Sequence, residues 1–221
     1  MSPACPVCRG QATRPFLRVD AQDYWRCGVC SATFLDPAGR PTRAAEKAEY
    51  DRHQNRIGDP GYRSFLQPAV HAVAERLAPG AAILDYGCGP GPALGAMLEE
   101  RGYRVSLYDP IYRPDATALD GPYDAITCTE VVEHFHDPAG QFERIDALLR
   151  RGGWLIVMTR FQTDDSRFVG WHYRRDPTHV VFYRPETFML LGRRLGWQVA
   201  CQPPQLVVLR KMGRGPQPAS I

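Results

Sequence analysis

The most informative stretch of this sequence is Ile83-Leu84-Asp85-Tyr86-Gly87-Cys88-Gly89-Pro90-Gly91. An apolar segment that carries one acid runs into three glycines at every second position, and Pro92-Ala93-Leu94 then begins a helical pattern. Glycines at such a turn let the backbone bend sharply and let a ligand approach where a Cβ atom would collide. The helix that follows offers unpaired backbone N–H groups at its N-terminus. This strand–turn–helix unit predicts a site for a nucleotide-like ligand.

The spacing of the glycines separates two classes of ligand. A dinucleotide-binding turn has the pattern G-x-G-x-x-G, whose last glycine would fall at position 92, where this chain has Pro92. The observed pattern is Asp85-x-Gly87-x-Gly89-x-Gly91. It resembles motif I of the class I S-adenosylmethionine-dependent methyltransferases, in which an acid lies just before the glycines. A tight loop without a ligand would show the same glycines, so the remaining segments have to decide.

Strand-like and helical segments alternate along the chain. The expected strands are 82–86, 103–108, 123–128, 154–159, 178–183, 197–201 and 206–211. The expected helices are 42–56, 62–77, 91–101, 138–149 and 185–195. This alternation predicts an α/β fold with a Rossmann-like, doubly wound sheet of seven strands, mostly parallel and closed by an antiparallel C-terminal hairpin.

Length and charge restrict the class of protein. A chain of 221 residues holds one α/β domain and a small appendage, and 44% hydrophobic with 23% charged residues is ordinary for a globular protein. The net charge of +3 is too small for a strong nucleic-acid field over the whole chain. The sequence has neither a membrane-spanning apolar run nor a signal-peptide pattern, so we expect a cytoplasmic protein that does not use a membrane.

Two C-x-x-C pairs lie near the N-terminus, at Cys5 and Cys8 and at Cys27 and Cys30, with a hairpin-like stretch at 13–26 between them. This spacing is typical of a zinc ribbon, in which four thiolates close the coordination shell of a structural Zn²⁺. The alternatives are two disulfides or a redox-active pair. A reducing compartment disfavours the first, and the second would not need both pairs.

The motifs divide the chain into four parts. The expected boundaries are a zinc ribbon at 1–40, a helical linker at 41–61, a methyltransferase-like domain at 62–211 and a disordered tail at 212–221. Glycine and proline in the last ten residues and their terminal position favour disorder there.

Further motifs make the resemblance specific. Asp109 ends the second expected strand, where an acid can accept both hydroxyls of a ribose. Tyr123-Asp124, a Glu130-Val131-Val132-Glu133-His134-Phe135 segment and the turn at 148–154 follow in order. Together they resemble ubiquinone-pathway O-methyltransferases and the methyltransferase type 11/12/23 group over 62–211. The resemblance implies that the cofactor-binding residues are Asp85, Tyr86, Gly87, Cys88, Gly89, Gly91, Asp109, Thr129 and Glu130.

Glu130, Glu133 and His134 have the spacing i, i+3, i+4, which places side chains on one face of a helix. Such a group can act as a general base, or it can bind Mg²⁺, Mn²⁺ or Zn²⁺. A similar E-x-x-E-H occurs in small-RNA 3′-terminal ribose methyltransferases, where a distant histidine completes a metal site. His179 has the matching place here. The catalytic candidates are therefore Glu130, Glu133, His134 and His179, although a glutamate placed only to stabilise a helix N-terminus would show the same pattern.

The identity of the methyl acceptor is expected to depend on the aromatic and basic stretch at 160–183. The candidate acceptor-binding residues are Trp171, His172, Tyr173, Arg174 and Arg175. Arginines among aromatic rings suit a planar or anionic ligand, but a surface loop with a structural tryptophan has the same composition.

Three functions are consistent with these patterns. The first is an enzyme that methylates a small molecule, at a hydroxyl oxygen, with or without a divalent metal. The second is an RNA methyltransferase whose ribbon grips RNA through its arginines and through Phe16, Tyr24, Trp25 and Phe34, which would serve equally well as a contact with the catalytic domain. The N-P-P-Y tetrapeptide of base-amino methyltransferases is absent at 127–130, which disfavours the second function. The third is a non-catalytic cofactor-binding or scaffold protein, which the intact glycine turn and Asp109 disfavour.

Overall fold

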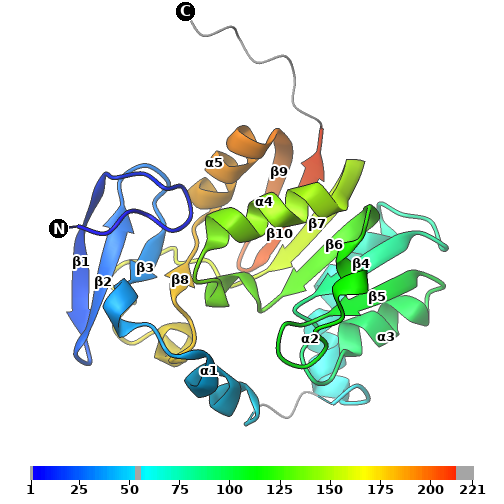
Figure 1. Ribbon diagram of the computed structural model, residues 1–221, viewed down its shortest axis with the longest axis horizontal. Coiled ribbons are helices and arrows are strands. Elements are labelled where there is room, and N and C mark those ends of the chain that lie inside the picture. The colour runs from blue at the N-terminus through cyan, green and yellow to red at the C-terminus, as the bar shows by residue number, and fades with distance from the viewer. Residues whose placement is uncertain (1, 53–55, 213–221) are drawn as a thin grey trace, which may run out of the picture.

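The computed structural model describes residues 2–52 and 56–212, and two sheets organise them (Figure 1). The larger sheet has the strand order β5-β4-β6-β7-β10-β9. Its strands are β4 Ala82–Tyr86, β5 Arg104–Tyr108, β6 Tyr123–Thr129, β7 Leu149–Met158, β9 Trp197–Gln202 and β10 Leu206–Lys211. The first four pair in parallel, while β10 is antiparallel to both β7 and β9. The predicted mostly parallel sheet with an antiparallel C-terminal hairpin is confirmed.

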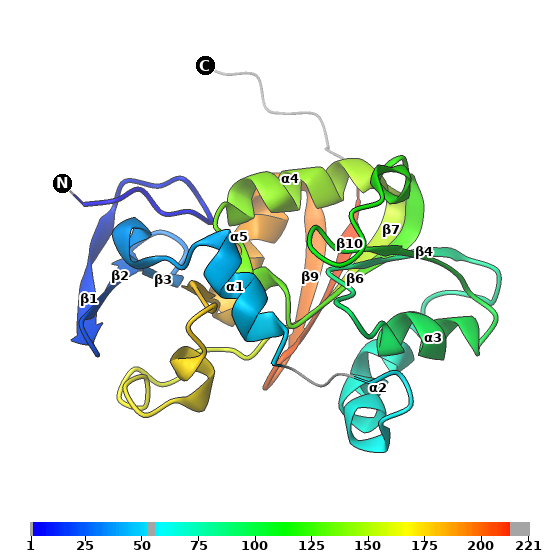
Figure 2. The same ribbon diagram turned by 60° about the horizontal axis from the view of Figure 1, so that its bottom comes forward.

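Helices cover both faces of this sheet. Figure 2 shows α4 on one side and α2 and α3 on the other. The helices are α1 Arg43–Tyr50, α2 Pro60–Ala74, α3 Ala93–Glu99, α4 Pro138–Leu148 and α5 Pro185–Leu195. Short 3₁₀ turns are η1 Pro37–Gly39, η2 Ala116–Leu119, η3 Val132–His134 and η4 His172–Arg175. Each face buries its own cluster of apolar side chains, one against α4 and α5 and one against α2 and α3, so the sheet is doubly wound.

Local sequence signals explain where the helices begin and end. Asp59 accepts a hydrogen bond from the Tyr62 N–H at 2.6 Å, and Pro60 follows as the first residue of α2. An aspartate cap followed by proline satisfies an N–H that would otherwise lack a partner, and proline has none to satisfy. Gly196 has φ of 72° and ends α5, because glycine adopts this left-handed conformation without steric cost.

The smaller sheet contains the N-terminal ribbon and has the order β1-β2-β3-β8. Its strands are β1 Thr13–Val19, β2 Gln22–Cys27, β3 Thr33–Leu35 and β8 Val181–Phe182. The predicted hairpin at 13–26 is confirmed by the pairing of β1 with β2. The prediction of seven strands in the large sheet is wrong, because β8 pairs with β3 of the ribbon instead. Since β10 occupies the edge of β7, the segment around Val181 finds its hydrogen-bonding partner in the ribbon.

The linker and the tail complete the comparison with the predicted organisation. The helix predicted at 42–56 is α1, which ends at Tyr50. Of the predicted disordered tail, residues 213–221 lie outside the described part of the chain. The boundaries at 40 and 61 stay predictions, although the pairing of β3 with β8 crosses both of them. In the ranges that the structure describes, we find no helix of the length and apolar character needed to cross a membrane.

Candidate active site

A cleft of about 1030 Å³ opens at the carboxyl ends of β4, β5 and β6. In an open α/β sheet this edge is where ligands bind. Every residue that the sequence suggested for the cofactor lines the cleft: Asp85, Tyr86, Gly87, Cys88, Gly89, Gly91, Asp109, Thr129 and Glu130. His134, His172, Tyr173 and His179 line it too, so the glycine turn and the histidine-containing segments face one space.

The glycine turn has a shape that only glycine allows. Gly87 has φ of 81°, and a Cβ atom there would lie 2.5 Å from the Cγ2 atom of Val131. The Gly89 N–H donates to Oδ2 of Asp109 at 3.1 Å, while the Ile111 and Tyr112 N–H groups donate to Oδ1 at 2.8 and 2.9 Å. Asp109 therefore ties the turn to the end of β5. Because each carboxylate oxygen accepts about two hydrogen bonds, Oδ2 has room for one from a ligand hydroxyl.

Asp85 lies beneath the turn and is 2% exposed. The Thr127 hydroxyl donates to its Oδ1 at 2.9 Å. Burial raises the pKa of Asp85 from an ordinary 3.8 to about 6. Ionisation of Asp85 is therefore unfavourable in the folded protein without a ligand. A cation or a hydrogen-bond donor in the cleft would stabilise the charged carboxylate and offset this free energy.

Replacing Asp85 with asparagine is expected to stabilise the ligand-free protein at pH 7.5 more than at pH 4. The folded state holds the Asp85 proton more tightly than the unfolded state, so stability from the protonated acid is lost as pH rises from the ordinary pKa to about 6. Asparagine does not titrate, so the variant does not lose this stability. The unfolding free energy of the variant minus that of the wild type should therefore grow by about 2–3 kcal/mol over this interval. Urea unfolding at the two pH values measures it. The exposed Asp120→Asn is the control, and an equal response of the two variants would contradict the expectation.

Glu133 is fully buried behind the cleft wall. The Tyr173 hydroxyl donates to its Oε1 at 2.5 Å and lies 3.1 Å from Oγ1 of Thr159. Burial raises the pKa of Glu133. Burial, and then the charge of Glu133, raise the pKa of Glu130 to about 9. Oε2 of Glu133 and Oε1 of Glu130 are buried and have no hydrogen-bond partner among the described residues. A buried carboxylate oxygen without a partner favours a cation or a hydrogen-bond donor beside it.

The segment that contains Glu130, Glu133 and His134 is not the α-helix that the spacing predicted. Glu130 has φ of 53°, and residues 132–134 form the single 3₁₀ turn η3. A left-handed non-glycine residue is uncommon and occurs often at functional sites. The i, i+3, i+4 spacing fits one turn as well as a helix, which is why it misled the prediction.

Two histidines lie beside Glu133. The Nδ1 atoms of His134 and His179 lie 3.0 and 2.6 Å from the carbonyl oxygens of Thr178 and Tyr173. A carbonyl only accepts, so each Nδ1 carries the proton and the lone pair of the neutral ring is on Nε2. Burial lowers the pKa of His134, which favours this neutral form. Ligand atoms of Glu133, His134 and His179 lie within 4.8 Å of one another, a group without Glu130.

Comparison with known proteins identifies the family. The family model described as a methyltransferase domain matches residues 50–202, more than half of the chain. The chain belongs to this family of methyltransferases. Ubiquinone biosynthesis O-methyltransferase of Bordetella bronchiseptica is 30% identical over 220 residues, which cover 84% of this chain and 84% of that protein. The protein of the same name from Leptothrix cholodnii is 33% identical over 104 residues, and this match covers 36% of the chain and 44% of that relative's length.

A solved structure supports the fold. The S-adenosylmethionine-dependent methyltransferase of Archaeoglobus fulgidus superposes with a TM-score of 0.53 at 18% identity, covering 67% of this chain and 94% of that one. At this level of identity the likeness shows a shared fold. It confirms the predicted Rossmann-like architecture.

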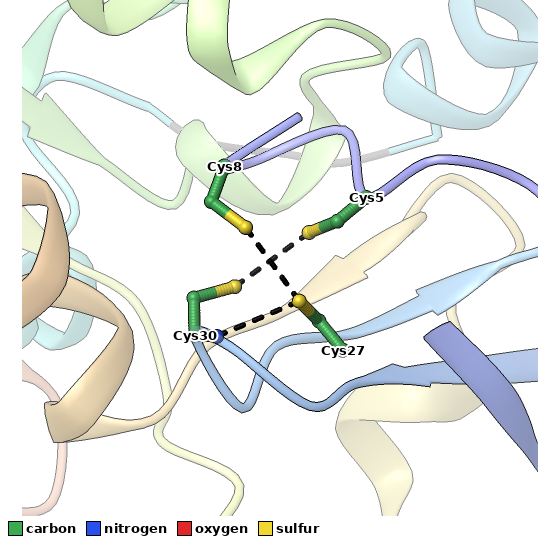
Figure 3. A group of neighbouring side chains, drawn as sticks. All are labelled: Cys5, Cys8, Cys27 and Cys30. Carbon is green, nitrogen blue, oxygen red and sulfur yellow. Dashed lines mark hydrogen bonds between the residues drawn. The ribbon is translucent and has the colours of Figure 1, made fainter. Parts of the chain in front are cut away.

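The four N-terminal cysteines also lie together (Figure 3). Sγ of Cys5 lies 3.6 Å from Sγ of Cys30, and Sγ of Cys8 lies 3.5 Å from Sγ of Cys27. Neither pair is at the distance of about 2.05 Å that a disulfide bond has, and all four cysteines are free in the structure. Tetrahedral zinc with Zn–S bonds of about 2.3 Å separates its sulfurs by about 3.8 Å, so the cluster fits that ion.

The predicted acceptor-binding residues separate into two groups. His172 and Tyr173 line the cleft, whereas Trp171, Arg174 and Arg175 do not. Arg174 is buried and donates to Oδ2 of Asp20 in the ribbon at 3.0 Å. The Trp171 ring lies 5.8 Å from that of Phe182. The partner of Arg174 lies 154 positions away in the chain, so the sequence around Arg174 does not reveal this ion pair.

Sequence reasoning missed a wall of the cleft. Arg43, Glu46 and Tyr50 of α1 line it, as do Arg160 and Asp176. The Tyr50 and His134 rings meet edge to face with their centroids 5.2 Å apart. The linker helix therefore belongs to the site. The sequence feature that could have indicated this is the tyrosine at the end of this amphipathic helix.

Proposed function

We propose that this protein transfers a methyl group from S-adenosylmethionine to a hydroxyl oxygen of a small molecule. One observation carries the proposal: the glycine turn and two histidines, the buried His179 and the half-buried His134, open into a single cleft. The relatives named above are O-methyltransferases of ubiquinone biosynthesis, which favours oxygen as the methylated atom.

The residues of the cleft fit this cofactor. The open space beside Gly89, where an added Cβ would meet no atom within 4 Å, leaves the backbone accessible to the ligand. Asp109 would hold the ribose with the remaining acceptor position of Oδ2, and Thr129 and Glu130 would face the methionine part. S-adenosylmethionine supplies a methyl group on a positively charged sulfur. The protein's own task is then to orient the acceptor and to remove its proton.

We further propose that Glu133, His134 and His179 hold a divalent metal ion, with Glu130 beside it. The support is the distance between their ligand atoms, the contacts of both Nδ1 atoms with carbonyl oxygens, and the two buried carboxylate oxygens without partners among the described residues. A cation there would lower the pKa of an acceptor hydroxyl. If His134 instead acts alone as the base, its neutral Nε2 takes the proton.

The four cysteines are proposed to bind one structural Zn²⁺, on the support of the sulfur distances. Zinc bound by four cysteines has no open position for a substrate. Reduced cysteines are typical of the cytoplasm, where we place the protein.

The RNA-binding alternative has less support. Of the ribbon aromatics considered for stacking on RNA, Tyr24 and Phe34 are buried, and the Phe16 ring lies 5.3 Å from that of Phe168. These rings pack against the methyltransferase fold, which leaves fewer of them for bases.

Chelation tests the metal and the cofactor separately. Dialysis against a mild chelator that leaves one zinc per chain in the ribbon should abolish methylation of a catechol panel. The calorimetrically measured affinity for S-adenosylmethionine should stay within about two-fold, because the proposed ligand groups do not overlap the glycine turn. Mn²⁺ should restore activity. Full activity in chelator would reject the metal and favour His134 as base, whereas absence of S-adenosylmethionine binding would reject the proposed function itself.

A further inference from the structure

The backbone of Val180 is hydrogen-bonded both to the ribbon and to the active site. The Val180 N–H donates to the Glu133 carbonyl at 2.9 Å, and the Val180 carbonyl accepts from the Leu35 N–H at 2.9 Å. Leu35 ends β3, which pairs with β8 immediately after Val180. Val180 is fully buried, and His179 precedes it in the chain. The position of β3 therefore fixes Val180, which is hydrogen-bonded to one proposed metal ligand, Glu133, and follows another, His179, in the chain.

Ion pairs fix the preceding loop to the same strands of the ribbon. Oδ1 of Asp165 accepts from Arg26 at 2.6 Å and also accepts from Arg184 and from Nε2 of Gln162 at 3.0 Å. The Arg26 side chain is 8% exposed, and its Nε donates to Oγ1 of Thr33 at 2.8 Å. One carboxylate thus connects β2 and β3 of the ribbon with both ends of the loop that carries Tyr173.

The cysteine knuckles have further contacts with the large domain. The Thr187 hydroxyl donates to the Cys30 carbonyl at 2.8 Å, and Arg194 donates to the Cys8 carbonyl. The Ala139 N–H donates to the Pro6 carbonyl at 3.1 Å. Both α4 and α5 therefore hold the peptide segments around the sulfur cluster, which lets the ribbon act as a fixed support.

The cofactor half of the cleft is organised differently. The Gly87 N–H donates to the Tyr108 carbonyl at 2.7 Å, and the Gly89 N–H donates to Asp109. These contacts come from β5, at the edge of the large sheet away from the ribbon. A change at the junction of ribbon and loop should leave this half unaltered.

We propose that the ribbon is the positioning element of the acceptor half of the active site. Through β3, Arg26 and Asp165 it sets the places of Glu133, Tyr173 and His179. Asp165 is thereby a positioning residue, since it lies outside the lining of the cleft and acts through the loop. The kinetic part of this inference rests on the proposed function, and the structural part does not.

Asp165→Asn tests the inference, with the neighbouring Asp164→Asn as a matched control. Asp164 has local partners, the N–H and hydroxyl of Ser166 and the guanidinium of Arg167, and none among the ribbon residues that the structure describes. In the chain with its ribbon intact, Asp165→Asn should lower kcat/KM for the acceptor about 10- to 100-fold, because a small misplacement of reacting groups has this effect. The Kd for S-adenosylmethionine should change less than about two-fold.

Hydrogen exchange gives the readout that does not depend on activity. Amides at 178–183 should exchange faster in Asp165→Asn than in the wild type, while those at 82–86 in β4 stay protected. Asp164→Asn should match the wild type in both measurements. If Asp165→Asn also matches the wild type in exchange and in kcat/KM, the inference is wrong. If the wild type itself fails to bind S-adenosylmethionine, the proposed function fails and the exchange comparison still decides the role of the ribbon.

Discussion

Glu133→Gln is expected to lower kcat by about 10²- to 10³-fold and to weaken Mn²⁺ binding by about 10- to 100-fold. The amide keeps the shape of the side chain and an oxygen that can accept from the Tyr173 hydroxyl. It removes the negative charge that a divalent ion needs from its ligand. The loss therefore tests the charge of Glu133 separately from its packing.

The measurement combines steady-state kinetics with a Mn²⁺ titration followed by electron paramagnetic resonance. Glu143→Gln is the control, because Glu143 is a surface glutamate whose partner is Arg9 at 2.8 Å. A thermal midpoint of Glu133→Gln close to that of the wild type would show that the fold survives. Equal kcat and equal Mn²⁺ affinity in wild type and Glu133→Gln would reject the metal site as proposed.

The parts of the fold that sequence predicts well are those with a local physical cause. The glycine turn can be predicted because its conformation requires glycine, since a Cβ at Gly87 would collide with Val131. The end of α5 can be predicted because Gly196 adopts the left-handed conformation there. The hairpin of β1 with β2 can be predicted because a short loop joins the two strands. Such constraints act within a few residues of the position that reveals them.

The errors arise where the partner is distant. The strand around Val181 reads as part of the large sheet, because its apolar character fits any buried strand and does not name its neighbour. Its partner, Phe34, is far away in the chain. Arg174 reads as an acceptor contact for the same reason, since its pairing with Asp20 depends on how the ribbon packs.

Of the four predicted catalytic residues the structure brings three together, and their roles stay predictions. The chain order of Glu130, Glu133, His134 and His179 suggests one cluster, yet Glu130 lies outside the compact group of ligand atoms. Its left-handed backbone, with φ of 53°, points the residue in a direction that a helical reading does not anticipate. Backbone conformations of this kind are stabilised by the surrounding structure and carry no sequence signature.

Cys27→Ser is expected to lower the thermal midpoint by about 10–15 °C and to abolish zinc binding. Binding of structural zinc contributes roughly 10–16 kcal/mol to the folding free energy of small domains. A loss of only about 4–5 kcal/mol in the free energy of unfolding would lower the thermal midpoint of a chain of this length by the expected amount. The effect should reach beyond the ribbon, because Cys27, Phe34 and Phe182 belong to the same buried apolar cluster as Phe142 of α4.

Calorimetry and zinc content per chain check this expectation, with Cys201→Ser as the matched control. Cys201 is half-buried on β9 and lies outside the four-sulfur group, so its replacement should leave one zinc per chain and a midpoint near that of the wild type. A reductant should leave the wild type intact, whereas a strong chelator should reproduce Cys27→Ser. The opposite pattern would mean that the four cysteines stabilise the fold as disulfides, against the sulfur separations of 3.5 and 3.6 Å. Because β3 is bonded to Val180, unfolding of the ribbon should remove methylation before the large sheet itself melts.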